Sequence, residues 1–122
     1  MDEIQRTGDD QAGFSVALDA ATATVRVRAW GFWNAEIAAA FGGMVRDACR
    51  SAPRRSALVL DMTELRPMRD EGQRSFGMLM DALSSLRLTS VTIMTTSQLI
   101  KLQLLRIANQ SAAKGSVQFV QA

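Results

Sequence analysis

The sequence predicts a single α/β domain with a mainly parallel β-sheet of about five strands. Two observations support this class. Short apolar or alternating segments, which are typical of strands, take turns along the chain with longer segments of helical periodicity. In addition, 122 residues of which 48% are apolar suffice for one packed core, and no repeat or linker divides the chain. We therefore expect one domain over residues 14–122, preceded by a polar, flexible leader over residues 1–13.

The domain is expected to begin with a β-hairpin. Its strands are predicted over residues 14–18 and 24–30, with a turn over residues 19–22. In the second strand, apolar residues alternate with Arg26, Arg28 and Trp30, which is the period-2 pattern of a sheet buried on one face. We therefore expect the arginine face of this strand to carry no covering helix.

Helices and strands alternate after the hairpin. Asn34 follows a break in the strand pattern and can accept a hydrogen bond from an unpaired N–H at the start of a helix. Gly42 and Gly43 lie inside this helix, where each costs roughly 1 kcal/mol relative to alanine, so they indicate close packing or a kink. Thr96 or Ser97 is expected to cap the last helix. The predicted elements are helices over 34–51, 70–86 and 97–109, and strands over 57–61, 90–95 and 116–120.

The composition argues against an enzyme. The chain has no histidine and no tyrosine, so the commonest general base is absent. Without a base to activate it, Ser75 is not expected to be a nucleophile, and we interpret it as a helix-surface residue. Asp61, Glu64, Asp70 and Glu71 could in principle hold Mg²⁺. However, carboxylates beside helix starts are common and no phosphate-binding loop accompanies these four. We expect no catalysis, no metal site and no cofactor.

Charge and cysteine content indicate the class of partner and the compartment. Fourteen Lys and Arg residues against twelve Asp and Glu residues give a net charge of +2, which is too small a bias to indicate a nucleic-acid partner. The single cysteine, Cys49, excludes an intrachain disulfide framework and is expected to be buried and structural. The chain contains no run of about eighteen apolar residues. We expect a cytoplasmic, soluble protein that does not insert into membranes.

The most informative motif runs from Asp61 to Gly72, between a buried strand and a helix. It matches without a gap the pattern D-L-S-x-V-x-x-M-D-S-S-G, with residues of matching type at Asp61, Thr63, Leu65, Met68 and Gly72. On this motif and the element order, residues 14–120 resemble the STAS superfamily, the domain of bacterial anti-sigma-factor antagonists, and especially its SpoIIAA-like group. The resemblance implies strands in sequential order, helices stacked mostly on one face, and a regulatory protein-binding role in a bacterial cytoplasm.

Asp70 and Glu71 replace the two serines of this motif, the first of which is phosphorylated by a partner kinase in antagonists of the family. A carboxylate cannot accept a phosphoryl group in that way, and Asp70 imitates the sign of a phosphoserine but not its full charge or geometry. Asp70 is also well placed to cap the following helix, with Gln73 at capping-box spacing, and we favour that structural role. We expect a binder that is not switched by phosphorylation, with a protein partner contacting Met68, Arg69, Asp70, Glu71 and Gln73.

Two other surfaces provide alternatives. The helix over 97–109 is apolar on more than one side, which favours self-association as a homodimer. Its residues Ile100, Leu104, Ile107 and Ala108 can face the sheet, whereas Leu99, Leu102 and Leu105 take other directions. Alternatively, the open sheet face with Arg26, Arg28 and Trp30 could make the domain a small-molecule or lipid sensor, in which an arginine holds an anionic head group.

Overall fold

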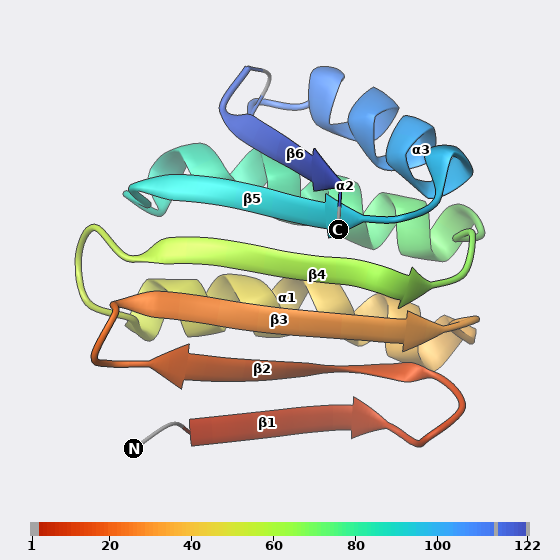
Figure 1. Ribbon diagram of the computed structural model, residues 1–122, viewed down its shortest axis with the longest axis horizontal. Helices are drawn as coiled ribbons and strands as arrows, with labels where there is room; N and C mark the ends of the chain where they lie inside the picture. The colour runs from red at the N-terminus through yellow and green to blue at the C-terminus, as the bar shows by residue number, and fades with distance from the viewer. Residues whose placement is uncertain (1–2, 114, 122) are drawn as a thin grey trace.

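The computed structural model describes residues 3–113 and 115–121. Its strands and helices follow one another along the chain as Figure 1 shows. They are β1 (Glu3–Gly8), β2 (Gly13–Asp19), β3 (Thr24–Gly31), α1 (Ala35–Ser51), β4 (Ala57–Leu65), α2 (Asp70–Ala82), the short 3₁₀ helix η1 (Leu83–Ser85), β5 (Ser90–Thr95), α3 (Gln98–Asn109) and β6 (Val117–Gln121).

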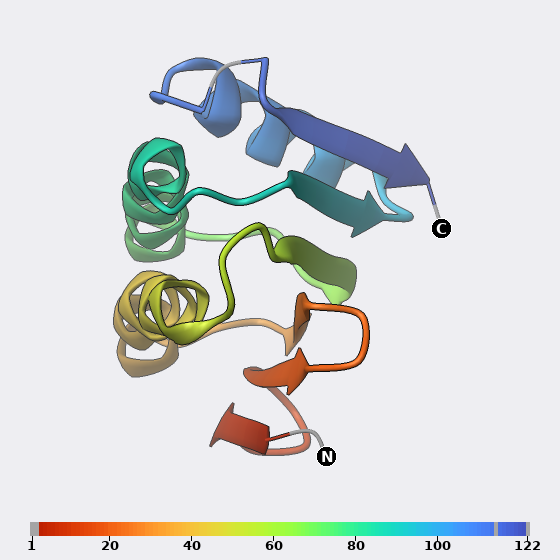
Figure 2. The ribbon, with the colours of Figure 1, turned by 90° about the vertical axis from the view of Figure 1, so that its left-hand side faces the viewer.

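These strands form one six-stranded sheet in the sequential order β1-β2-β3-β4-β5-β6. The neighbours from β1 to β3 are antiparallel, whereas β3, β4, β5 and β6 run parallel to one another. Each parallel pair is joined by one of the helices α1, α2 and α3. In Figure 1, α1 and α2 lie behind the sheet and α3 lies beside β6, and Figure 2 shows α1 and α2 stacked on one side of the sheet. The predicted α/β class and mainly parallel sheet are therefore confirmed, with six strands in place of about five.

The difference in strand number comes from the expected leader over residues 1–13, which was wrong as an account of the secondary structure. Strand β1 occupies part of it and pairs with β2 in register from Glu3↔Leu18 to Gly8↔Gly13. The strand was not predicted because it lies at the edge of the sheet and Ile4 is its only large apolar residue, at 69% exposure. An edge strand with little buried surface has no apolar alternation for a sequence pattern to detect.

The core lies between the helices and the facing side of the sheet. Four aromatic rings form a continuous cluster in it, with centroid separations between 4.9 and 6.4 Å. The rings belong to Phe14 of β2, Trp33 of the β3–α1 loop, Phe41 of α1 and Phe76 of α2. Because the cluster includes residues from the hairpin, both helices and a loop, it fixes how α1 and α2 sit on the sheet.

Helices α1 and α2 approach each other closely at Gly42. A Cβ atom at this position would lie 2.6 Å from the carbonyl oxygen of Ser75, and the Gly42 N–H donates a hydrogen bond of 2.8 Å to Ser75 Oγ. The close-packing interpretation of Gly42 is thus confirmed, whereas a Cβ atom at Gly43 would meet no atom of the described neighbours within 4 Å. The interpretation of Ser75 as a surface residue was wrong, because its side chain is buried at this helix contact.

The third helix and strand β5 follow the prediction closely, whereas β4 extends beyond its predicted end at Asp61 to Leu65. Ser97 caps α3 by accepting a hydrogen bond from the N–H of Ile100, and the helix ends at Asn109 as expected. Leu99 and Leu102 are more than 60% exposed.

Within the part of the chain that the structure describes, no helix combines the length and the apolar character needed to cross a membrane.

Candidate functional site

The candidate site lies where the parallel strands β3 and β4 end and the chain enters α1 and α2. Gly31 makes the first of these turns with a φ of +76°, and a Cβ atom there would lie 1.9 Å from the carbonyl oxygen of Gln11. The turn therefore requires glycine. Trp33 then enters the core and donates from Nε1 to the Gly13 carbonyl at 3.0 Å, and Asn34 caps α1 by accepting from the Ile37 N–H at 2.9 Å.

The second turn is held by two glutamines. The Met68 N–H donates to Gln103 Oε1 at 2.9 Å, and the Met68 carbonyl accepts from Gln103 Nε2 at 2.9 Å and from Gln73 Nε2 at 3.0 Å. Gln73 Oε1 in turn accepts from Arg106 of α3. The loop before α2 is therefore fixed to both α2 and α3. Gln103 was not among the predicted site residues, although a glutamine between Leu102 and Leu104 is a usable signal of a polar contact in an apolar segment.

An open groove of about 570 Å³ lies between the two turns and the first turns of α1 and α2. It is lined by Trp33, Asn34, Ala35, Ala38, Met68, Arg69, Asp70, Glu71, Gly72 and Gln73. The structure thus brings all five residues predicted to contact a partner to one surface. Trp33, Ala38 and Met68 are buried, whereas Arg69, Asp70 and Glu71 are exposed. The groove therefore combines an apolar floor with a charged rim.

The predicted capping box at the start of α2 was wrong. Arg69 occupies the N-cap position in extended conformation and makes no side-chain cap hydrogen bond, while Asp70 is already the first helical residue. The Gln73 amide donates to Met68 and so does not cap the helix either. Asp70 and Glu71 in the first turn instead face solvent, where their charge complements the positive end of the helix dipole. Both carboxylates are available for an external contact.

An exposed aromatic ring lies beside this rim. Phe32, at 46% exposure, is covered on one side by the Arg69 guanidinium, whose carbon lies 4.8 Å from the ring centroid. Such a cation–π pair is attractive by about 0.5–1 kcal/mol at exposed sites. Phe32 was not among the predicted binding residues, because the sequence alone does not show which aromatic residue of Trp30, Phe32 and Trp33 stays on the surface.

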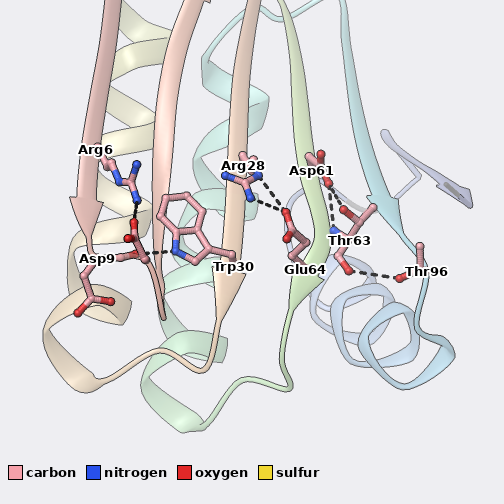
Figure 3. Close-up of polar contacts among 9 residues, drawn as sticks. Arg6, Asp9, Arg28, Trp30, Asp61, Thr63, Glu64 and Thr96 are labelled. Carbon is pink, nitrogen blue, oxygen red and sulfur yellow. Dashed lines mark hydrogen bonds and ion pairs between the residues drawn. The ribbon is translucent and has the colours of Figure 1, made fainter.

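The alternative site, on the sheet face opposite the helices, is filled by the protein itself (Figure 3). Trp30 is only 6% exposed, with the guanidinium carbons of Arg6 and Arg28 at 5.0 and 4.9 Å from its ring centroid. Its Nε1 donates to the Asp9 carbonyl at 2.7 Å, and Arg28 forms an ion pair with Glu64 at 2.5 Å. Arg26 and Arg28 are exposed, as predicted for a face without a covering helix.

The depression around Trp30 has a volume of about 390 Å³ and is lined almost entirely by polar groups. Since Arg6 and Arg28 cover the indole, an apolar ligand would have to displace at least one of them to reach the ring. The structure therefore brings Arg28 and Trp30 together, but as a packed unit and not as an open aromatic floor.

The carboxylates considered for Mg²⁺ are divided between separate contacts. Asp61 accepts from the Thr63 N–H and hydroxyl at 3.0 and 2.6 Å, and Glu64 pairs with Arg28 (Figure 3). Among residues 3–113 and 115–121, no group of three or more His, Cys, Asp or Glu residues could hold a metal ion.

Cys49 is buried in the core, as predicted. Burial raises the pKa of its thiol to about 12, so the thiolate that a nucleophilic reaction needs is scarce at neutral pH.

Comparison of the chain with family models, curated proteins and solved structures found no match.

Proposed function

We propose that this protein is a non-catalytic regulatory module of the STAS or SpoIIAA-like type, which binds a protein partner in the groove between α1 and α2. The observation that carries the proposal is that Met68, Arg69, Asp70, Glu71 and Gln73, chosen from the motif, all line one open groove. The sequential strand order and the stacking of α1 and α2 on one face also agree with the fold that the resemblance implies.

The groove has the properties of a small protein-recognition site. Its floor is formed in part by Trp33 and Met68, each 6% exposed, which leaves a small apolar area for a partner's side chain, and its rim offers charges that set orientation. The loop at Met68 is already fixed by hydrogen bonds to Gln73 and Gln103, so binding orders few groups and loses little entropy. The acidic pair Asp70 and Glu71 favours a partner segment that carries basic residues beside its apolar anchor.

The same residues argue for binding that is independent of phosphorylation at this position. Asp70 and Glu71 are carboxylic acids and have no hydroxyl that a kinase could modify. Asp70 does not cap α2, so it stabilises the helix only through its interaction with the helix dipole. This small structural role supports a role of the carboxylate in binding.

The sensor function on the open sheet face remains the second candidate, and it receives less support. Its aromatic residue, Trp30, is covered by Arg6 and Arg28, and the charge of Arg28 is partly neutralised by Glu64. Of the three residues proposed for a ligand, only Arg26 combines exposure with freedom from these contacts.

Self-association is a separate proposal that concerns α3. Leu99 and Leu102 lie one turn apart and are 63% and 61% exposed, so a second copy could cover them. If they form a dimer interface, Leu99→Glu with Leu102→Glu should convert a dimer into a monomer in sedimentation experiments. A wild-type monomer at high concentration would contradict this proposal without affecting the groove.

Affinity capture from an extract of the source cells, followed by native mass spectrometry, tests the proposed function. We expect the purified protein to retain a stoichiometric protein partner, and Asp70→Lys with Glu71→Lys to weaken its binding by roughly tenfold or more, as expected for loss of charge-assisted contacts. Asp10→Lys with Asp47→Lys is the matched control, because it changes the charge equally at exposed surface ion pairs. Retention of the partner by the Asp70 and Glu71 variant, or of a small molecule without any protein, would contradict the proposal.

A further inference from the structure

A second candidate site lies at the opposite ends of the parallel strands, where β4 and β5 begin. The loop before β4 and the segment between η1 and β5 enclose an open depression of about 720 Å³. It is lined by Arg54, Arg55, Arg87, Leu88 and Thr89. Three of its five lining residues are therefore arginines, and all three are exposed.

The backbone presents two of these arginines in an unusual conformation. Arg55 has a φ of +63° and Arg87 a φ of +52°, in the left-handed region that favours glycine. The two segments are joined, because the Thr89 N–H donates to the Ser56 carbonyl at 2.9 Å and the Thr89 hydroxyl donates to the Arg55 carbonyl. The left-handed arginines consequently belong to one connected frame and not to two independent loops.

Among the residues whose side chains the structure describes, no carboxylate forms an ion pair with this cluster. The ion pairs among the described residues involve Arg6, Arg28 and Arg46, and none includes an arginine of the depression. The acids on adjacent elements have other contacts: Asp47 pairs with Arg46, Asp19 accepts from the amides of Ala21 and Thr22, and Asp81 accepts from the amide of Ala112.

Helix ends also leave the cluster positive. The C-terminal end of α1 lies at this end of the strands, and a long helix end carries a partial charge of only about −0.5. Three full guanidinium charges exceed this contribution. Helix-dipole compensation therefore explains a cation in the last turn, such as Arg50, but not three arginines beyond the helix ends.

We propose that Arg54, Arg55 and Arg87 form a binding site for the diphosphate group of a soluble small ligand. Guanidinium groups bind phosphate oxygens through paired N–H donors, and three of them match the charge of two linked phosphates. The volume of the depression lies in the range of small-ligand sites. A membrane-bound source is disfavoured, because the large exposed apolar side chains of the described chain lie on other segments: Ile4, Phe32, Met78, Leu99, Leu102 and Val120.

Titration with inorganic pyrophosphate, followed by calorimetry at near-physiological ionic strength, tests this site. We expect saturable binding by the wild-type protein and a loss of about tenfold or more in affinity for Arg55→Gly with Arg87→Gly. Glycine is chosen because it accepts a positive φ, so these variants should keep the fold, which their melting temperature checks. Arg66→Gln with Arg74→Gln removes the same charge elsewhere on the exposed surface and should bind as the wild type does.

Three results would overturn the proposal. The first is the lack of saturable pyrophosphate binding by the wild-type protein, and the second is an equal loss of affinity in both double variants, which would indicate only a general charge effect. The third is binding to phosphatidylcholine vesicles that contain a phosphoinositide but not to pyrophosphate, which would identify a lipid as the source of the phosphates. None of these results bears on the partner groove, which lies at the opposite ends of the strands.

Discussion

At the scale of single residues, Asn34 and Asp70 begin the two helices that border the groove but stabilise them differently. Asn34 Oδ1 accepts a hydrogen bond from the Ile37 amide, which otherwise has no intrahelical acceptor. Asp70 lies inside the first turn of α2 and acts on that helix only through its charge. The first residue is therefore structural, while the second leaves its carboxylate free for a partner.

Alanine substitutions should separate these two roles. Asn34→Ala should lower the free energy of unfolding by about 1 kcal/mol through loss of the cap. Asp70→Ala should change it by less than about 0.5 kcal/mol, because the lost dipole interaction is offset by the higher helix propensity of alanine. Urea denaturation of both variants measures the difference. Equal destabilisation by the two substitutions would mean that Asp70 caps α2 after all.

The pKa of Cys49 yields a prediction about pH. The folded thiol has a pKa of about 12 against an ordinary value of 9.0, so the folded state holds the proton more tightly than the unfolded state. The resulting stabilisation is complete below about pH 9 and is lost as the pH rises toward 12. At about pH 8, alkylation of Cys49 should be much slower in the folded protein than in urea. Equal alkylation rates would show that the thiol is accessible in the folded state.

At the scale of elements, the contact between α1 and α2 depends on a glycine that cannot be replaced without moving a backbone. Gly42 and Gly43 are adjacent in sequence, yet only Gly42 faces Ser75. This contact aligns the first turns of both helices, and with them the two sides of the groove.

The adjacent glycines form a matched pair for mutation. Gly42→Ala should destabilise the protein by about 1–3 kcal/mol, because the new methyl group would overlap the Ser75 carbonyl oxygen. Gly43→Ala should stabilise it by up to about 1 kcal/mol, since it gains helix propensity without a clash. Thermal or urea unfolding of the two variants tests this. Similar effects of both substitutions would contradict the helix contact described above.

Most elements could be predicted because their apolar periodicity is strong, as in β3, β5 and α3. Strand β1 could not, because it has a single large apolar residue. Strand β4 was predicted only as far as Asp61, and it continues to Leu65 through an irregular register with β3 between Arg28 and Trp30. The predicted cap at Asp70 failed for a related reason: the start of α2 depends on contacts of Met68 with Gln103 of a distant helix, which local sequence does not encode.

At the scale of the whole molecule, the strand order determines where chemistry can gather. Because helices join the parallel strands, all strand-to-helix turns lie at the C-terminal ends of these strands and all helix-to-strand turns lie at their N-terminal ends, as Figure 1 shows. The proposed partner groove lies at the C-terminal ends of the strands, and the arginine cluster lies at their N-terminal ends. The five residues that the motif predicted to contact a partner line the groove together because they are close in sequence. The motif could not predict Trp33 and Ala38 opposite them, because only the packing of α1 beside α2 brings these residues near.

The location of the bound partner tests the central proposal most directly. A photo-reactive amino acid at position 35, on the exposed rim of the groove, should cross-link a protein from an extract of the source cells, whereas the same amino acid at position 26, on the open sheet face, should not. Neither substitution alters the carboxylates expected to bind. Cross-linking from position 26 alone would place the partner on the sheet face and contradict the assignment of function to the groove.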